Sequence, residues 1–177
     1  MIKKILIAAQ SLDGFIAQSR EQISTDWTSA ADRQFFAKKT SEIGVMLMGS
    51  NTYATIGKPL PGRTTILLTP AHTFSGARIL DGKPLEHNLY ISAGLSDEQI
   101  FTLLEQSGVG QIAICGGASV YQHFLKANLI DEIYLTIEPI FLGSGIKLLA
   151  DGLPFSQTWQ IQERLILNKQ TTVFHRG

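Results

Sequence analysis

The sequence predicts an α/β protein: a three-layer α/β/α sandwich with a mostly parallel central sheet and an antiparallel C-terminal edge. Short apolar runs typical of buried strands alternate with amphipathic segments in the middle of the chain, and strands alone follow near its end. The chain has 177 residues, of which 44% are hydrophobic and 17% charged, enough for one well-packed core. We therefore expect residues 1–177 to form a single domain.

The first elements can be assigned within residues 1–40. Residues 5–9 are continuously apolar with β-branched members, which predicts a buried first strand. The turn SLDG leads into residues 15–17, and the polar stretch 18–28 is expected to be a loop long enough to cover a site. Residues 29–32 have the spacing of a capping box, with Asp in place of Glu, so a helix should follow them.

The remaining elements follow from hydrophobic periodicity and turn residues. Strands are expected at 45–48, 64–69, 77–80, 88–91, 111–115, 131–138, 157–167 and 171–175, and helices at 50–57, 94–108 and 118–128. Ser96 should cap the second of these helices, and Asn128 should end the third. Asn168-Lys169 separates the last two strands and is a hairpin signal.

Composition limits the partners and the compartment. The formal net charge is zero, so nothing indicates a nucleic-acid or membrane-surface partner, and no apolar stretch is long enough to span a bilayer. Cys115 is the only cysteine, which excludes an internal disulfide and fits a reducing compartment. The apolar run at the N-terminus is too short for a secretion signal. We expect a cytoplasmic protein.

The histidines give no sign of a metal site. None of His72, His87, His123 and His175 has a carboxylate or a second histidine at ligand spacing on a predicted helix. We expect surface positions for all four and no metal. No GxSxG or Cys–His arrangement indicates covalent catalysis.

Two strand–glycine–helix turns, at 49–52 (GSNT) and 116–119 (GGAS), are the main functional signal. Each places backbone and side-chain donors at a helix N-terminus, where phosphate oxygens can bind. Two such sites would suit a dinucleotide, and the lack of an acidic residue between Ser50 and Lys58 favours NADP over NAD. The alternatives are tight packing at the glycines and simple helix capping by Ser50 and Thr52.

Asp32 is the carboxylate of most interest, and two interpretations are open. In the first, it serves only as a capping residue in the first turn of its helix, stabilised by the helix dipole. Alternatively, it points into a cleft near Trp27 and Phe36, where one carboxylate could accept two parallel hydrogen bonds from a heterocycle. Trp27 is then either a lone packed aromatic or part of the cleft wall.

Several stretches resemble the dihydrofolate reductase superfamily. These are IAAQSLDGFIA (7–17), MGSNTYATIGKPLPGR (48–63) and ICGGASVYQHFLKA (114–127), together with a Trp27 that stands five residues before Asp32. The later stretch LIDEIYLTIEPIFLGSGIKLL (129–149) is more similar to the reductase domain of riboflavin biosynthesis, which shares this fold. The resemblance covers most of the chain and implies an NADPH-dependent oxidoreductase acting on a small heterocyclic substrate.

Position by position, the resemblance implies a set of site residues. The catalytic group would be Asp32, with Thr136 and Trp27 supporting it. Phe36, Ile56, Leu60 and Arg63 would bind the substrate, with Arg63 matching the arginine that binds the folate carboxylate. NADPH would contact Ala9, Ile16, Gly49, Ser50, Asn51, Thr52, Thr69, Gly116, Gly117, Ala118, Ser119, Val120 and Tyr121, across a cis Gly116–Gly117 peptide.

Four positions depart from the folate reductase pattern. Ser50, Pro70 and Ser119 stand where folate reductases place groups that bind or neighbour the cofactor phosphates, which weakens the preference for NADPH over NADH. Arg33 stands where they carry an apolar residue against the pterin. The resemblance therefore favours reduction of a phosphoribosylaminouracil, as in riboflavin biosynthesis, by a protein of a group that commonly dimerises. The alternatives are dihydrofolate reduction and a non-catalytic nucleotide-binding protein on the same fold.

Overall fold

The computed structural model describes residues 1–86, 88–148, 160–168 and 171–176 of the chain. Its strands are β1 (Lys3–Ser11), β2 (Phe15–Ala17), β3 (Val45–Gly49), β4 (Thr64–Leu68), β5 (Arg78–Ile79), β6 (Leu89–Ile91), β7 (Gln111–Ile114), β8 (Glu132–Glu138), β9 (Ile146–Lys147), β10 (Glu163–Ile166) and β11 (Thr172–Arg176). Its helices are α1 (Ala30–Ile43), α2 (Ser50–Ile56), α3 (Asp97–Gln106) and α4 (Ala118–Lys126), and a 3-10 turn, η1 (Ser24–Asp26), precedes α1.

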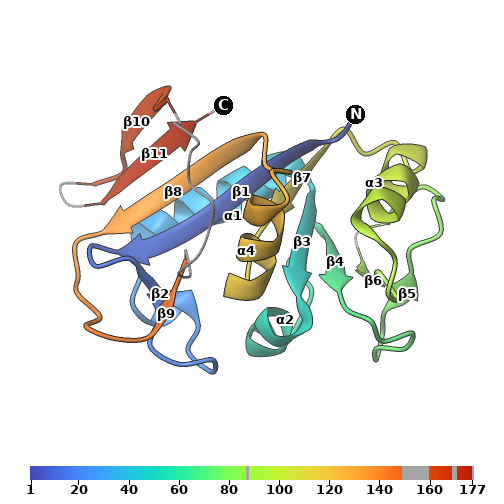
Figure 1. Ribbon diagram of the computed structural model, residues 1–177, viewed down its shortest axis with the longest axis horizontal. Coiled ribbons are helices and arrows are strands. Elements are labelled where there is room, and N and C mark those ends of the chain that lie inside the picture. The colour runs from blue at the N-terminus through green and yellow to red at the C-terminus, as the bar shows by residue number, and fades with distance from the viewer. Residues whose placement is uncertain (87, 149–159, 169–170, 177) are drawn as a thin grey trace.

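The main sheet has the strand order β10-β11-β8-β1-β7-β3-β4-β6-β5 (Figure 1). All described neighbours from β8 to β5 pair in parallel, whereas β11 pairs antiparallel with both β8 and β10. The predicted sheet, mostly parallel with an antiparallel C-terminal edge, is therefore confirmed. β1 lies between β7 and β8, so the first strand of the sequence occupies the middle of the sheet.

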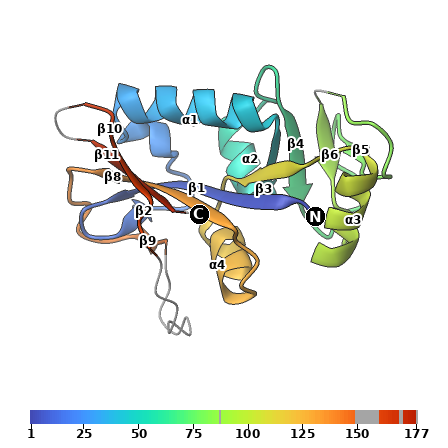
Figure 2. The same ribbon diagram turned by 90° about the horizontal axis from the view of Figure 1, so that it is seen from above.

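Helices cover both faces of the sheet, with α1 and α2 on one side and α4 on the other (Figure 2). Because successive strand residues point to opposite faces, β1 divides its apolar side chains between two cores. Ile5 and Ile7 pack in the core under α1, and Leu6 packs in the core that contains Phe124 of α4. The predicted three-layer arrangement is confirmed.

The helix ends follow local sequence signals. Ser96 caps α3 through a complete capping box with Gln99, as its position predicts. Gly44 ends α1 in the left-handed region, with a φ of 82° that favours glycine. Asn128, which follows α4, also has a positive φ, of 54°, as expected for the residue that ends this helix.

A two-stranded sheet of β2 and β9 lies beside the main sheet, and the sequence patterns do not predict β9. Long-range hydrogen bonds hold this segment in place, and its sequence has no periodicity that would predict a strand. The Leu12 N–H donates to the Ile140 carbonyl at 2.9 Å, and the Asp13 carboxylate accepts the backbone N–H groups of Leu142 and Gly143 at 3.1 and 2.7 Å. Such contacts link residues about 130 positions apart, so no local pattern reveals them.

Several predicted boundaries differ from the structure. The stretch 18–28 contains η1, and the strand expected at 77–80 is reduced to β5. The strand expected at 157–167 is observed as β10, while residues 157–159 lie outside the described residues, as do Lys169 and His87.

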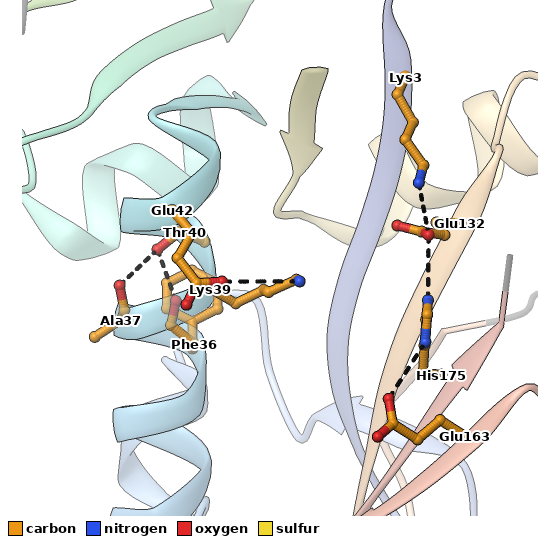
Figure 3. Close-up of polar contacts among 9 residues, drawn as sticks. All are labelled: Lys3, Phe36, Ala37, Lys39, Thr40, Glu42, Glu132, Glu163 and His175. Atoms are coloured by element: carbon orange, nitrogen blue, oxygen red, sulfur yellow. Dashed lines mark hydrogen bonds and ion pairs between the residues drawn. The ribbon is translucent and has the colours of Figure 1, made fainter. Parts of the chain in front are cut away.

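His175 is not a surface residue, so the prediction of its position is wrong. Its side chain is 13% exposed and its ring stacks on Tyr134 with centroids 4.2 Å apart. Its Nε2 lies 3.3 Å from Glu132 Oε1 and its Nδ1 lies 3.8 Å from Glu163 Oε2, while Lys3 Nζ lies 2.7 Å from the same Glu132 oxygen. Figure 3 shows these contacts in a row from Lys3 to Glu163. Because β11 pairs with both β8 and β10, the His175 side chain is enclosed. The sequence of a five-residue strand does not predict this pairing.

His72 and His123 are exposed, as expected, and His123 Nε2 lies 2.7 Å from Asp97 Oδ2. Within the described segments, no three His, Cys, Asp or Glu residues gather as metal ligands would. None of the described helices has the length and apolar character needed to cross a bilayer.

Candidate active site

The candidate site lies at the carboxyl ends of the parallel strands, where open α/β sheets bind their ligands. Ala9 and Thr136 are register partners on β1 and β8, close to this edge. Gly49 ends β3, and Gly116 follows β7 after Cys115. Residues from four distant parts of the sequence therefore meet at one edge of the sheet.

The two glycine turns contact each other directly. The Gly49 N–H donates to the Gly116 carbonyl at 2.9 Å. A Cβ on Gly117 would lie 2.8 Å from Thr52 Oγ1, and one on Gly49 would lie 3.3 Å from a Val120 methyl carbon, so the fold leaves little room for side chains here. The Gly116–Gly117 peptide is cis, as the resemblance implies. The two turns form one continuous glycine-lined surface.

This surface fits a dinucleotide phosphate group. Gly117 is the N-cap of α4 and supplies no side-chain cap, so the first backbone N–H groups of α4 remain available as donors. Ser119 is exposed beside them, and Ala118 is half-buried. Backbone donors that no side chain shields are the groups that bind a pyrophosphate, so the residues present fit a nicotinamide dinucleotide.

The other predicted cofactor residues differ in exposure. Asn51 is exposed, whereas Ala9, Ile16, Ser50 and Thr52 are half-buried. Thr69 is buried, and its Oγ1 accepts the Ala71 N–H at 3.2 Å.

Val120 and Tyr121 are buried, with hydrophobic contacts in the core on the α4 side. The Tyr121 hydroxyl donates to the Ile7 carbonyl at 2.8 Å, and burial raises the pKa of this hydroxyl well above its usual value. Tyr121 therefore stays neutral and joins α4 to β1 beneath the glycine turns.

Asp32 is not a reciprocal cap of its helix. Ser29 caps α1 by accepting the Asp32 N–H on Oγ at 3.1 Å, as predicted. The other half of a capping box would need the Asp32 carboxylate to accept the Ser29 N–H, but that N–H donates to Glu138 Oε1 at 2.8 Å. The Asp32 carboxyl is thus free of the cap, which favours the cleft interpretation.

The environment of Asp32 raises its pKa above the ordinary value of 3.8. Burial is the largest cause, because the side chain is almost fully enclosed and the charged form loses water. A hydrogen bond with the Thr136 hydroxyl lowers the pKa, while the nearby Glu138 charge raises it. The Thr28 hydroxyl lies beside the carboxyl without completing a well-aligned hydrogen bond.

Trp27 and three apolar residues make up the rest of the predicted substrate site. Trp27 ends η1, five residues before Asp32, and its indole N–H is buried without a partner among the described protein atoms. Phe36, Ile56 and Leu60 are half-buried and pack against the same core, on the face covered by α1. The three apolar residues that we expect to bind substrate therefore share one face of the sheet.

Arg63 is a buried cation. Its Nη1 donates to Thr40 Oγ1 at 2.8 Å, and its Nε donates to the Pro61 carbonyl at 3.2 Å. Thr40 is correctly oriented because its own hydroxyl donates to the Phe36 carbonyl of α1 (Figure 3). Burial lowers the pKa of the guanidinium, and Arg63 makes no ion pair with any carboxylate of the described residues. A buried, uncompensated guanidinium is suited to an anionic ligand.

Arg33 donates to backbone carbonyls of the segment before α1. Its Nη1 donates to the carbonyls of Thr25 and Thr28, so this side chain ties the 24–28 segment to α1.

A separate hollow of about 690 Å³ lies at the opposite, amino end of the sheet. Its lining includes Lys3, Gly44, Thr64 and Gly110, and it contains none of the predicted site residues.

The fold and this site together define an α/β protein of the reductase type, with a glycine-lined turn at the start of α4 and a buried carboxyl in the first turn of α1. More narrowly, the chain belongs to the dihydrofolate reductase family, whose model matches residues 3–143. An uncharacterized protein of Bacillus subtilis, YwjB, is 32% identical over 157 residues that cover 82% of each chain. A putative dihydrofolate reductase of Caenorhabditis elegans is 27% identical and covers all of this chain and 92% of its own length.

Solved structures show the same fold. A putative riboflavin biosynthesis protein from Shewanella sp. PV-4 superposes with a TM-score of 0.77 at 22% identity, covering 99% of this chain and 98% of its own. Dihydrofolate reductase from Enterococcus faecalis, complexed with NADP(H), gives 0.68 at 23% identity over 98% and 96% of the two chains. A Thermotoga maritima deaminase and 5-amino-6-(5-phosphoribosylamino)uracil reductase gives 0.78 at 16% identity over 99% of this chain and 56% of its own.

Sequence reasoning missed Glu138 as a site residue. Its partner Ser29 is 109 positions away, and the alternating pattern of β8 shows only that Glu138 points to one face.

Proposed function

We propose that this protein is an NADPH-dependent reductase that transfers hydride to a pyrimidine or pteridine substrate, most like 5-amino-6-(5-phosphoribosylamino)uracil reductase. The observation that carries this proposal is the Asp32 carboxyl. It is buried, bonded to Thr136 and free of the helix cap, and it comes from the first turn of α1, which packs on the strands β3 and β7 that lead into the two glycine turns. Buried carboxyls with a raised pKa are common among groups that bind or protonate a heterocycle.

The glycine turns would hold the cofactor. Backbone donors at the start of α4 would bind the pyrophosphate, and Ser50 and Thr52 would contribute hydroxyls from the neighbouring turn. The backbone of Ala9 and Ile16 would hold the nicotinamide carboxamide. A reduced nicotinamide, when bound, supplies a hydride.

The substrate ring would lie against the α1 face. Asp32 would accept hydrogen bonds from adjacent ring N–H and amino groups, with Thr136 fixing the orientation of its carboxyl. Phe36, Ile56 and Leu60 would enclose the ring and exclude water, which holds donor and acceptor atoms in reactive geometry. Protonation of the product would use the Asp32 carboxyl or a water ordered by it.

Arg33 supports an aminouracil substrate over dihydrofolate. Its side chain is held by the carbonyls of the 24–28 segment, so no apolar side chain from this position packs on the ring. The similarity of residues 129–149 to the riboflavin-type reductases points in the same direction.

Dihydrofolate reduction is the second candidate, and Arg63 favours it. A buried guanidinium without a described carboxylate partner would suit the glutamate carboxylate of folate. The same cation would also suit the phosphate of a ribosylaminouracil, so Arg63 alone does not separate the two substrates.

The test follows NADPH oxidation with dihydrofolate in one reaction and the phosphoribosylaminouracil in another. Turnover of the aminouracil alone supports the proposal, and turnover of dihydrofolate alone overturns it in favour of the second candidate. D32N should abolish turnover while leaving NADPH affinity nearly unchanged, and NADH in place of NADPH measures the cofactor preference. NADPH binding without oxidation in either reaction would indicate a non-catalytic nucleotide-binding protein.

Two further expectations belong to the same proposal. Residues 1–177 should behave as one domain, and the protein should form a homodimer in solution. Limited proteolysis tests the first, and light scattering tests the second.

A further inference from the structure

Glu138 is a buried carboxylate that the proposed reaction does not use. It is the last residue of β8 and is 3% exposed. Its Oε1 accepts the Ser29 N–H at 2.8 Å, and its Oε2 accepts the Thr171 hydroxyl at 3.0 Å. No cation of the described residues pairs with it. Because burying a carboxylate without a cation is costly, this position calls for a physical reason.

The same hydrogen-bond network reaches Asp32. Thr171 Oγ1 lies 3.2 Å from Ser29 Oγ, and that Ser29 oxygen accepts the Asp32 N–H at 3.1 Å. Thr136, which bonds the Asp32 carboxyl, lies two positions before Glu138 on β8 and so points to the same face of the sheet. One strand therefore brings both a hydroxyl and a carboxylate against the first turn of α1.

We propose that Glu138 is a positioning residue for Asp32. By taking the Ser29 N–H, Glu138 occupies the capping role that Asp32 would otherwise fill and so leaves the Asp32 carboxyl directed at the substrate. Its negative charge opposes ionisation of that carboxyl, which favours the form that can donate a proton. Only the catalytic consequence rests on the proposed function, since the effect on Asp32 is a property of the folded protein.

Among the charged groups around Asp32, Glu138 is the one whose charge acts effectively on the Asp32 carboxyl. From α1 itself, Arg33 is exposed and held by the backbone carbonyls of the 24–28 segment, so solvent screens its attraction. From α4, the Tyr121 hydroxyl is neutral, and Asp26 of η1 is exposed. Burial and the Glu138 charge both raise the pKa of Asp32, in agreement with this geometry.

The direct test is a titration of the Asp32 carboxyl carbon by NMR, assigned by its loss in D32N. E138Q keeps the oxygen that accepts the Ser29 N–H and removes the charge. We expect the pKa of Asp32 to fall by roughly one unit in E138Q, because removing a nearby like charge shifts a carboxyl pKa by about that amount. T171V is the matched control, because it removes the contacts of the Thr171 hydroxyl with Glu138 and Ser29 and keeps the Glu138 charge, and it should not lower the pKa of Asp32.

An unchanged Asp32 titration in folded E138Q would overturn the proposal. If E138Q does not fold, E138D provides the test, because the shorter side chain withdraws the carboxylate from the Ser29 N–H. The Asp32 carboxylate then becomes free to accept that N–H, which should lower the pKa of Asp32. An unchanged Asp32 titration in folded E138D would overturn the proposal equally.

The kinetic test uses the pH dependence of kcat/KM. If Asp32 donates a proton, the pH at which activity falls should drop by the same roughly one unit in E138Q, which makes the variant about tenfold slower above both values. A purely structural role for Glu138 would reduce activity equally at all pH values and would overturn the proposal. If the wild-type protein turns over neither substrate, the proposed function fails, while the NMR titration still decides the effect of Glu138 on Asp32.

Discussion

The contact between the two glycine turns predicts a large coupling between Gly117 and Thr52. In G117A the new Cβ would lie 2.8 Å from Thr52 Oγ1, below the 3.0 Å that real Cβ atoms almost never cross. Gly117 has a φ of −76°, which any residue adopts, so the cost comes from this contact alone. Forced contacts of this kind cost about 1–3 kcal/mol of unfolding free energy.

A double-mutant cycle measured by urea denaturation tests the origin of that cost. T52A removes the oxygen that the new Cβ would meet, so G117A/T52A should recover about 1–2 kcal/mol relative to the sum of the single variants. G116A is the control: Gly116 has a φ of 119°, which strains any other residue, and T52A should not rescue it. If G117A and T52A are additive within about 0.5 kcal/mol, the argument from close contact is wrong.

Three further predictions concern stability. Because the pKa of Asp32 is raised above its unfolded value of 3.8, the folded state binds more protons between those two values and loses stability as pH rises through them. D32N should therefore be more stable than wild type at pH 7, by about 1.4 kcal/mol per unit of pKa shift. This gain in stability should vanish below pH 3.8. A D32N variant less stable than wild type at pH 7 would contradict the prediction. F124A should lower the free energy of unfolding by about 3–5 kcal/mol because Phe124 is fully buried. F141A changes a side chain that is 76% exposed, so its free energy of unfolding should stay within about 0.5 kcal/mol of wild type in the same urea denaturation experiment. S96A should lose about 1 kcal/mol with the capping box of α3, and an unchanged melting temperature would show that this cap contributes nothing.

Much of the fold could be predicted because its signals are local. The apolar run at β1 and the Ser96 cap each depend on residues within a few positions of one another. The Ser29 cap of α1 was also predictable, but its reciprocal partner was not. Glu138 takes that place from 109 residues away, and no spacing rule near Ser29 can show it.

The features that could not be predicted from the sequence depend on contacts between distant parts of the chain. His175 is enclosed because β10 folds beside β11 and Tyr134 offers its ring face, both consequences of strand pairing. β9 has two residues, too few for any periodicity. The burial of Arg63 likewise depends on Thr40 of α1, which lies 23 positions away. In the candidate site, residue types were predictable from the resemblance, whereas the freedom of the Asp32 carboxyl required the structure.

The central position of β1 also determines how the molecule would respond to a break in its chain. Arg20 is exposed, as are Ser19 and Glu21 beside it, so trypsin can reach this bond. Cleavage after Arg20 would leave the N-terminal fragment inserted between β7 and β8, held by backbone hydrogen bonds on both sides. The two pieces would then form a noncovalent complex that separates on unfolding, so its melting temperature would rise more steeply with protein concentration than that of the uncut protein.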